Sequence, residues 1–346
     1  MATYEDVAFD FRSDTVTLPT PDMKAAMMEA EMGDDVYGED PTVLALQDRI
    51  AAETGMEASL FFPTGSMANL VALMAQTEPG RQLYCGARGH VKLFELGSFA
   101  SVAGLSQVDV PDTHGFLDLE RLQKVWAPEI YYMTQPGIVV VENTHNIGGG
   151  LIYPVEELVD LHRFTQEKGV PLHMDGARLW HAAVAQGRPL STWTRHVESV
   201  MLSVSKGLGA PIGSVLAGSK AMIERALPLR KLLGGGMRQV GQLAAAALYA
   251  LDHHLVLLAR DHTRCQEVFG TIKNLPWLEA VAPQTNILII HTERPEAGDL
   301  VAHLTERGLK TLAISPSTVR AVFHLNLTDE ACERLADAIK EWGRTR

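Results

Sequence analysis

The segment SVSKGLGAPIGS, residues 203–214, places one lysine between an apolar run and a glycine-rich loop. Lysine is costly to bury unless its charge is paired. At an ordinary lysine pKa, roughly one side chain in a few thousand is neutral at about pH 7, and burial or a nearby cation raises that fraction. A neutral amine condenses with an aldehyde to form a Schiff base. Lys206 is therefore either a Schiff-base lysine or a solvated loop lysine. The first alternative requires the other parts of an aldehyde-cofactor site elsewhere in the sequence.

Short apolar runs alternate with helical stretches through the middle of the chain. This alternation predicts a mostly parallel sheet that is covered by helices on both faces. A long helix over residues 240–258 then leads to a strand at 286–291 and a terminal helix at 329–343. The expected strands of the sheet are residues 59–62, 138–141, 172–174, 199–203 and 213–217, and helices are expected at residues 66–76 and 155–168.

The length of 346 residues is more than one small core requires and predicts two packed domains. We expect an extended N-terminal arm over residues 1–20, a large domain over residues 21–250 and a small domain over residues 251–346. The expected fold class is α/β, with a smaller α+β domain at the carboxyl end.

The composition is acidic, with a formal net charge of −12, and this argues against a nucleic-acid or membrane partner. The three cysteines, Cys85, Cys265 and Cys332, have neither disulfide-framework nor metal-type spacing, so we expect a reducing compartment and no metal site. The acidic start of the chain is unlike a signal peptide, and the apolar stretch at 240–251 is too short to span a bilayer. We therefore expect a soluble cytoplasmic protein.

A second segment, PTGSMAN at residues 63–69, follows an expected strand and opens an expected helix. A helix N-terminus offers unpaired N–H groups and the positive end of a dipole, so a phosphate could bind at Gly65 and Ser66. Serine is also a preferred helix cap, and Ser66 could serve only in that role.

A third segment is the expected strand over residues 172–174, which is followed by Asp175 and a turn that leads to Arg178. Ligands bind at the carboxyl ends of the strands in open α/β sheets. Asp175 could hold a proton on a pyridine nitrogen, and a protonated ring is the electron sink that carbanion chemistry needs. Asp175 and Arg178 could instead form a local structural ion pair.

Three further polar positions carry possible chemistry. His90 follows a strand-like run at 82–85 and could stack over a flat ring or act as a base, although a lone histidine is more often structural. The segment ENTHN, residues 142–146, again places polar groups at the end of a strand. Arg320 stands in apolar surroundings and could bind a carboxylate bidentately or be a structural arginine.

Taken together and in this order, the motifs resemble those of the low-specificity L-threonine aldolases, which are pyridoxal-phosphate enzymes with the aspartate-aminotransferase type of fold. The resemblance runs nearly from end to end, and several long motifs in the right order make it specific. The motifs that carry it are RSDTVT (12–17), GDDVYG (33–38), PTGSMAN (63–69), ENTHN (142–146), DGAR (175–178), SKGLG (205–209) and GGGMRQ (234–239).

The resemblance implies a role for each matching position around the cofactor. Lys206 would form the Schiff base with pyridoxal 5'-phosphate, and Gly65 and Ser66 would hold its phosphate. Asp175 would bind the ring nitrogen, and His90 would stack on the ring.

The resemblance also implies the substrate site and the reaction. Ser13, Arg178 and Arg320 would hold the substrate carboxylate, with Arg178 close to the cofactor as well. The expected reaction is cleavage of L-threonine and L-allo-threonine to glycine and an aldehyde. The base that takes the hydroxyl proton would be His90 or a water molecule that His90 positions.

A shared site is the third implication. Lys231 and Arg238 would reach the phosphate from a neighbouring subunit, and Tyr37 would lie near the same substrate site. We therefore expect a homotetramer built as a dimer of dimers. Several members of the family that the chain resembles carry a second active-site histidine on the segment before Glu142, and this chain has Tyr132 at that position.

Three other functions remain open at the level of the sequence. β-Elimination from another amino acid would use the same cofactor. A non-catalytic cofactor-binding protein would keep Lys206 but would not need the carboxylate-binding arginines. A nucleotide-binding α/β protein is disfavoured because the chain has neither a G-x-G-x-x-G motif nor a P-loop.

Overall fold

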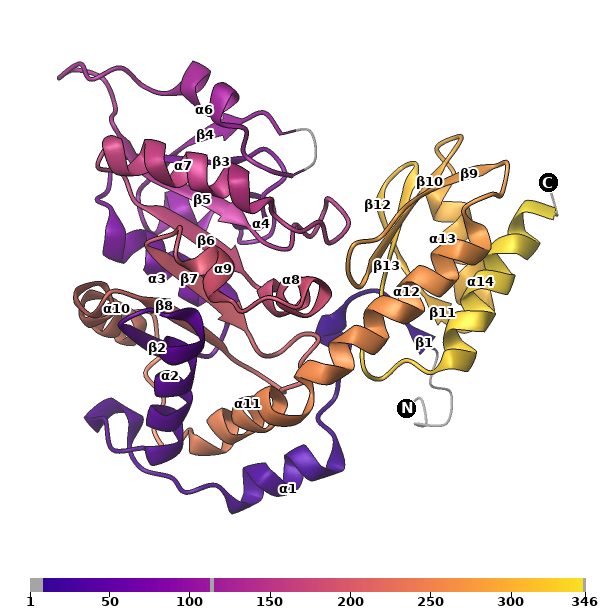
Figure 1. Ribbon diagram of the computed structural model, residues 1–346, viewed down its shortest axis with the longest axis horizontal. Helices are drawn as coiled ribbons and strands as arrows, with labels where there is room; N and C mark the ends of the chain where they lie inside the picture. Colours follow the sequence, from indigo (N-terminus) through magenta and orange to yellow (C-terminus); the bar gives the residue numbers. More distant parts are fainter. Residues whose placement is uncertain (1–8, 113–114, 345–346) are drawn as a thin grey trace.

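Two sheets organise the chain, and each is the centre of one domain (Figure 1). The computed structural model describes residues 9–112 and 115–344, so residues 1–8 of the predicted arm lie outside the described residues. Helices α11 (Gly241–His253) and α12 (Leu258–Ile272) lead the chain from the large domain into the small one.

The sheet of the large domain is mostly parallel, as predicted. Its strand order is β2-β8-β7-β6-β5-β3-β4. Strand β8 runs antiparallel to β2 and β7, and the other neighbours run parallel. The strands are β2 (Ala58–Phe62), β3 (Gln82–Gly86), β4 (Ser106–Val110), β5 (Pro136–Glu142), β6 (Leu172–Gly176), β7 (Ser199–Ser203) and β8 (Ser214–Gly218).

Helices cover both faces of this sheet because its strands are apolar on both sides. In β5, Ile138 and Val140 pack toward one face, and Val139 and Val141 pack toward the other. Continuous apolar runs are typical of parallel strands that are buried on both faces. The first face carries α3 (Gly65–Gln76), α5 (Ser98–Ser101) and α10 (Lys220–Leu232), and the second carries α2 (Pro41–Thr54), α7 (Val155–Glu167), α9 (Ser191–Thr194) and α11.

All five predicted strands are present within two residues of their expected ends. Strand β4 is missing from the predicted set because it lies at the edge of the sheet and four of its five side chains, all but that of Val110, are half-buried or exposed. Such a strand lacks the continuous apolar run that marks its neighbours.

The predicted long helix over residues 240–258 is wrong. A 3-10 turn, η3 (Leu255–Leu257), separates α11 from α12, and the two helices are bent by 52°. His254 at this break donates a hydrogen bond from Nδ1 to the carbonyl of Leu208 at 2.7 Å. Because α11 packs on α1 (Pro21–Glu29) and α2, we propose the domain boundary at the break rather than at the expected residues 250 and 251.

The small domain is α+β, as predicted. Its antiparallel sheet has the order β12-β13-β10-β9, and α12, α13 (Ala297–Glu306) and α14 (Asp329–Arg344) pack beside it (Figure 1). The strands are β9 (Leu278–Val281), β10 (Ile287–Thr292), β12 (Leu312–Ser315) and β13 (Thr318–Val322).

The first described residues, within the predicted arm, pack against the small domain. Strand β1 (Phe9–Asp10) pairs in parallel with β11 (Leu309–Lys310). Phe11 is buried in the core of the small domain, where its ring lies 5.4 Å from that of Phe323. The chain then crosses to the large domain through the 3-10 turn η1 (Asp14–Val16). The segment therefore contacts both domains.

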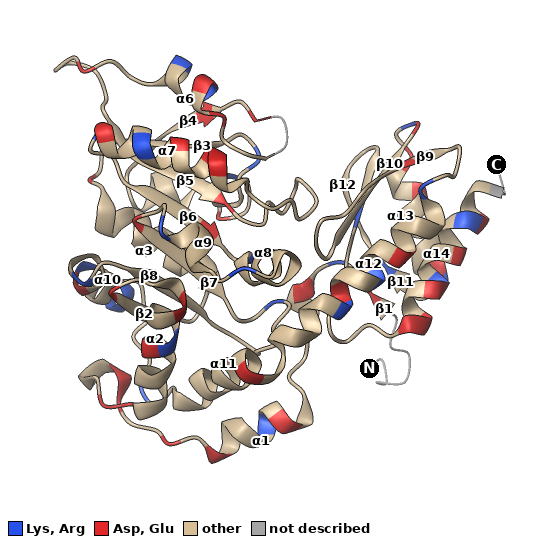
Figure 2. Cartoon of the chain, viewed as in Figure 1, with Lys and Arg blue, Asp and Glu red and all other residues tan. Residues whose placement is uncertain are grey.

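Charged residues are spread over the helices of both domains (Figure 2). Over residues 9–112 and 115–344, no single helix is both long enough and apolar enough to cross a membrane. Helices α11 and α12 pass such a test only as a bent pair, and the apolar side chains of α11 are buried in the core of the large domain.

Asp40 joins three segments of the large domain, and its replacement tests this part of the fold. Its Oδ1 accepts the N–H groups of Thr42 and Val43 at 3.1 Å, which caps α2, and its Oδ2 accepts those of Gly33 at 3.2 Å and Gly241 at 2.8 Å. We expect Asp40→Ala to lower the free energy of unfolding by about 2–4 kcal/mol, because it removes a helix cap and leaves buried N–H groups unpaired. Urea unfolding measures this difference.

Asp40→Asn is the matched control, because it keeps one acceptor for the helix cap and retains the shape of the side chain. Its loss of stability should be smaller than that of Asp40→Ala. A change of less than about 0.5 kcal/mol for Asp40→Ala, the size expected for an ordinary surface position, would contradict this account of the fold.

Candidate active site

The carboxyl ends of the parallel strands meet at one edge of the large sheet, and most of the predicted site residues gather there. Glu142 ends β5 and lies in register with Asp175 of β6. Lys206 follows the end of β7 by three residues, and α3 begins directly after β2. Open α/β sheets bind their ligands at this edge.

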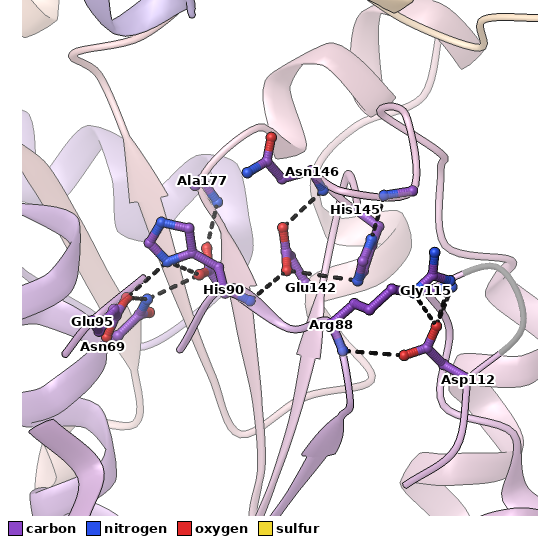
Figure 3. Close-up of polar contacts among 12 residues, drawn as sticks. Asn69, Arg88, His90, Glu95, Asp112, Gly115, Glu142, His145, Asn146 and Ala177 are labelled. Atoms are coloured by element: carbon purple, nitrogen blue, oxygen red, sulfur yellow. Dashed lines mark hydrogen bonds and ion pairs between the residues drawn. The ribbon is translucent and has the colours of Figure 1, made fainter. Parts of the chain in front are cut away.

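Asp175 is buried and accepts hydrogen bonds on both carboxylate oxygens. Oδ1 accepts the N–H of Ala177 at 3.1 Å, and Oδ2 accepts from Nδ2 of Asn69 at 3.0 Å (Figure 3). Burial alone would raise the pKa of Asp175, but the positive charges of His90 and Lys206 hold that pKa below its usual value. Asp175 is therefore ionised, the state that can keep a proton on a ring nitrogen.

His90 begins α4 (His90–Leu93) and lies between carboxylates. Its Nδ1 donates to Oε1 of Glu95 at 3.0 Å and lies 3.6 Å from Oδ2 of Asp175, and its backbone N–H donates to Glu142 at 2.9 Å (Figure 3). Burial alone would lower the pKa of His90, but these carboxylates raise it. With Nδ1 directed at Glu95, the second ring nitrogen, Nε2, remains for contact with another group.

Lys206 is half-buried in the loop after β7. Burial, and after it the guanidinium of Arg178, lowers the pKa of its amine. Thr17 donates a hydrogen bond to the backbone carbonyl of Lys206 at 3.0 Å and so holds the loop in place. A lowered pKa enlarges the neutral fraction that Schiff-base formation requires, and it argues against a solvated loop lysine.

The N-terminus of α3 has the form expected of a phosphate site. Thr64 caps this helix, since its Oγ1 accepts the N–H of Met67 at 3.2 Å, and Ser66 is therefore not the cap. The N–H groups of Gly65 and Ser66 lie in the first turn, where a helix has no internal acceptors for them. Asn69, one turn further along, bonds to the Asp175 carboxylate, so this helix end lies close to Asp175.

Arg178 is bound to Asp14, which is the partner that sequence reasoning did not assign. Its Nε and Nη2 donate to the two carboxylate oxygens of Asp14 at 2.8 and 2.6 Å, and both side chains are buried. Burial alone would raise the pKa of Asp14, but Arg178 holds it well below its usual value. The alternative of a local pair between Asp175 and Arg178 is therefore wrong. Because Nε and Nη2 of Arg178 are bonded to Asp14, Nη1 is the nitrogen that can bind a substrate carboxylate.

Arg320 reaches the same region from β13 of the small domain. Its Nη1 donates to Oδ1 of Asn146 at 2.6 Å and its Nη2 to the carbonyl of Arg12 at 3.1 Å, while Nε is buried without a hydrogen-bond partner. Burial, and after it the charge of Arg178, lowers the pKa of Arg320 to about 10. Ser13, beside Arg12, caps the turn η1. A carboxylate bound here would balance the cations and give the orphaned Nε an acceptor.

Three predicted residues lie on the surface of the single chain. Lys231, Arg238 and Tyr37 are exposed, and the ring of Tyr37 lies 5.7 Å from the guanidinium of Arg238. Arg238 also donates to Asp34 at 2.8 Å. Within the part of the chain that the structure describes, none of the three forms a hydrogen bond or ion pair with Lys206, and Arg238 is paired with Asp34 instead.

Tyr132 is 73% exposed, in the segment between α6 (Leu119–Val125) and β5, and its ring lies 5.1 Å from that of Tyr131. A different histidine lies near His90. His145 is buried, its Nδ1 accepts the N–H of Gly148 at 2.9 Å, and its Nε2 lies 3.8 Å from Glu142 (Figure 3). The segment ENTHN contains this residue, but its sequence alone does not indicate the contact.

Sequence reasoning also missed Asn69, Glu95 and Asp14 as site residues, although each lies within or beside a segment that it selected. His90, Glu95 and Asp175 offer ligand atoms within 4.8 Å of one another, a spacing that a metal ion could use. Hydrogen bonds from Asn69 at 2.9 and 3.0 Å and from His90 already pair these carboxylates, so their proximity is explained without a metal.

Comparison with known proteins identifies the family. The model for the beta-eliminating lyases matches residues 10–295. A low specificity L-threonine aldolase of Escherichia coli O157:H7 is 40% identical over 335 residues, which cover 96% of this chain and 98% of that protein. The chain belongs to the beta-eliminating lyase family. Within this family its sequence places it with the low-specificity L-threonine aldolases, and the resemblance drawn from the motifs is confirmed.

Solved structures confirm the fold of this lyase. A threonine aldolase of Leishmania major matches with a TM-score of 0.84 at 20% identity, covering 97% of this chain and 99% of that one. An aspartate aminotransferase of Thermus thermophilus matches with a TM-score of 0.73 at 18% identity, covering 97% of this chain and 96% of that one. The fold is therefore that of the aspartate aminotransferases, as predicted.

The cofactor of this beta-eliminating lyase is pyridoxal 5'-phosphate. The residues present fit it in three independent respects. A helix N-terminus with free N–H groups suits a phosphate, and Lys206 has a lowered pKa that suits an aldehyde. Asp175 is an ionised carboxylate at a strand end that suits a ring nitrogen.

The ion pair between Asp14 and Arg178 gives a pH-dependent prediction. We expect Asp14→Asn to lower the free energy of unfolding by about 3–5 kcal/mol at about pH 7, because it leaves a buried guanidinium without its counter-charge. The folded-state pKa of Asp14 is depressed, so the contribution is fully present above the ordinary aspartate pKa of about 4 and is lost as the pH falls below it. Urea unfolding across this pH range measures the difference.

Asp10→Asn is the matched control, because Asp10 pairs with Arg12 at an exposed position and should contribute less than about 1 kcal/mol. The difference between Asp14→Asn and the unsubstituted protein should shrink below about pH 4. A difference that stays constant down to about pH 2 would show that the charge of Asp14 does not stabilise the fold.

Proposed function

We propose that this lyase cleaves β-hydroxy-α-amino acids, including L-threonine and L-allo-threonine, to glycine and an aldehyde. The observation that carries the proposal is the meeting of Lys206, Asp175 and His90 with the cations Arg178 and Arg320 at one edge of the sheet. The names of the relatives support the same reaction and favour it over β-elimination.

The residues around the cofactor act by holding charge and orientation. Bound pyridoxal phosphate supplies an electron sink for the bond that breaks. Gly65 and Ser66 would hold its phosphate, Lys206 would supply the amine for its aldehyde, and Asp175 would keep a proton on its ring nitrogen. His90 lies against the same carboxylate and defines one wall of the site.

The substrate carboxylate binds between the small and large domains. Arg320 offers Nε, Arg178 offers Nη1, and Ser13 lies beside them. Two cations and a bound carboxylate would fix the direction of the Cα–Cβ bond relative to the cofactor, and orientation decides which bond breaks. The site therefore selects α-amino acids by their carboxylate.

Proton transfer completes the reaction. A base, the neutral form of His90 or a water molecule bound to His90, takes the β-hydroxyl proton, the Cα–Cβ bond breaks to release the aldehyde, and Cα takes up a proton to give glycine. Glu95 holds Nδ1 of His90, which leaves Nε2 for this task. A hydroxyl contacted only in this way is weakly discriminated, so both β-epimers should react.

A shared site accounts for the surface residues. We infer that Lys231, Arg238 and Tyr37 complete the site of a second subunit, because in one chain they are exposed and free to contact a neighbour. A homotetramer built as a dimer of dimers satisfies this need. In a symmetric oligomer each subunit would donate these residues to the site of a neighbour and would receive the same residues in its own site.

The proposed location is the cytoplasm. Cys85, Cys265 and Cys332 are free and buried thiols in the structure. Free thiols persist in a reducing compartment.

Replacement of Lys206 tests the function directly. We expect Lys206→Ala to lose the visible absorbance of the bound cofactor and to release acetaldehyde from L-threonine at less than about one thousandth of the original rate, because no other amine replaces the nucleophile. An absorbance spectrum and a coupled acetaldehyde assay measure both. The unsubstituted enzyme should turn over L-threonine and L-allo-threonine within about tenfold of each other.

Lys220→Ala is the control, because Lys220 is an exposed lysine at the start of α10 and should leave both readings unchanged. Release of ammonia and a keto acid instead of acetaldehyde would replace this proposal with β-elimination. A preference of about a thousandfold for one epimer would contradict the weak contact proposed for the hydroxyl.

Subunit complementation tests the shared site. Lys206→Ala and Arg238→Ala should each be nearly inactive alone. When the two are unfolded together and refolded, we expect about a quarter of the original activity, because half of the dimers are hybrids with one intact site. Mixtures that stay inactive after refolding, while unsubstituted protein recovers in parallel, would place Arg238 in the same site as its own Lys206.

A further inference from the structure

A chain of buried hydrogen bonds runs away from the back of Asp175, through three elements of the large domain. Asn69 on α3 donates to Oδ2 of Asp175 at 3.0 Å. Its Oδ1 lies 3.1 Å from Nε2 of His173 on β6, and Nδ1 of His173 lies 2.7 Å from the hydroxyl of Ser199 on β7. Gln76, at the end of α3, donates to that hydroxyl at 2.7 Å.

The donor and acceptor groups of these side chains determine the direction of every hydrogen bond in the chain. Asn69 faces two carboxylates, Glu95 at 2.9 Å and Asp175 at 3.0 Å, and only an NH₂ group can donate to both. Its oxygen therefore faces His173, so Nε2 of His173 carries the proton and Nδ1 accepts one from Ser199. The oxygen of Ser199 in turn accepts from Gln76.

The protonation of His173 agrees with this direction. Burial lowers the pKa of His173 to about 4, so the ring is neutral near neutral pH. A neutral imidazole donates from one nitrogen and accepts at the other, which a cation cannot do. Asn69, His173 and Ser199 have no exposed surface, and each polar atom in the chain has a partner.

All the N–H and O–H dipoles of this chain point toward Asp175. Hydrogen bonds in a chain polarise one another, and the effect is larger where the dielectric is low. The other charged or titratable groups that act on Asp175 are His90 on α4, Glu95 after it, Lys206 after β7 and Arg178 after β6. Of these, Glu95 opposes the ionisation of Asp175, because two carboxylates face each other across His90.

We propose that Asn69, His173 and Ser199 are positioning residues that keep the Asp175 carboxylate ionised and directed at the ring nitrogen of the cofactor. None of the three is assigned to the chemistry, and His173 and Ser199 act only through Asn69. The inference rests on the role of Asp175 in the proposed function, but it needs no particular substrate. It explains why a histidine and a serine are buried beneath the site with no contact to substrate groups.

The tautomer of His173 is the first test, and it uses the unsubstituted holoenzyme. In ¹⁵N-labelled protein, the ring nitrogens of His173 should report a proton on Nε2 and none on Nδ1. The ring should stay neutral from about pH 8 to about pH 5, since its pKa is far below the usual value. A proton on Nδ1, or a charged ring near neutral pH, would break the chain and overturn the proposal.

The second test reads the ring nitrogen of the cofactor and not the turnover. Holoenzyme is prepared with ¹⁵N-labelled pyridoxal phosphate, and the chemical shift of the ring nitrogen is followed against pH. We expect His173→Phe to lower the pH at which this nitrogen loses its proton by about one unit, a tenfold loss of proton affinity, because Asn69 loses its donor. Ser199→Ala should shift it by less, and His173→Gln, which keeps a donor toward Asn69, should restore most of the loss.

Thr194→Val is the matched control. Thr194 is buried, and its hydroxyl donates to Thr54 at 2.6 Å in a part of the domain that this chain of hydrogen bonds does not include. It should lower the melting temperature as Ser199→Ala does, but leave the titration of the ring nitrogen unchanged. Should His173→Phe not fold, Ser199→Ala and the tautomer of His173 decide the question.

The outcomes separate the two proposals. A ring nitrogen that is unprotonated in the unsubstituted enzyme would overturn the role of Asp175 itself. A protonated ring nitrogen that titrates identically in folded His173→Phe, Ser199→Ala and unsubstituted protein would overturn only the positioning role. Loss of stability without a shift of the titration would mark the three residues as structural, and it too would contradict the proposal.

Discussion

The buried ion pair between Asp14 and Arg178 joins the two domains at the active site. Asp14 follows the N-terminal strand that pairs with the small domain, and Arg178 follows β6 of the large sheet. A charge in a protein interior is tolerated only when it is paired and hydrogen-bonded, so neither partner can be lost without a large penalty. Arg320 of the small domain donates to the backbone carbonyl of Arg12 in the same segment and adds a further contact between this segment and the small domain.

The same pair shapes the electrostatics of the site. Burial, and after it the charge of Arg178, lowers the pKa of the Lys206 amine, and Asp14 pairs with the buried guanidinium of Arg178. Asp175, three residues before Arg178 in the sequence, is held ionised by His90 and Lys206 against the effect of burial. A lysine that loses its proton easily and a carboxylate that keeps its charge are the two conditions that Schiff-base chemistry with a protonated ring requires.

Local patterns predicted much of the fold, because they reflect how each element is buried. The apolar run of β5 indicated a strand covered on both faces, and the structure has helices on both sides of it. The break between α11 and α12 at His254 was not predicted, because the local sequence pattern does not indicate the hydrogen bond from His254 to Leu208. The N-terminal segment was expected to be an extended arm, and the contact of Phe11 with Phe323 in the small domain was not predicted, because the two residues are far apart in the sequence.

The sequence by itself determined the mostly parallel sheet, the polar residues at its carboxyl edge and the single lysine after β7, because periodicity and strand ends are local properties. The tertiary structure alone decided the partner of Arg178, which is 164 residues away, and the contact of His173 with Asn69, which spans 104 residues. It also decided which groups are charged, since the pKa of a side chain depends on burial and on neighbours that the folded chain brings together.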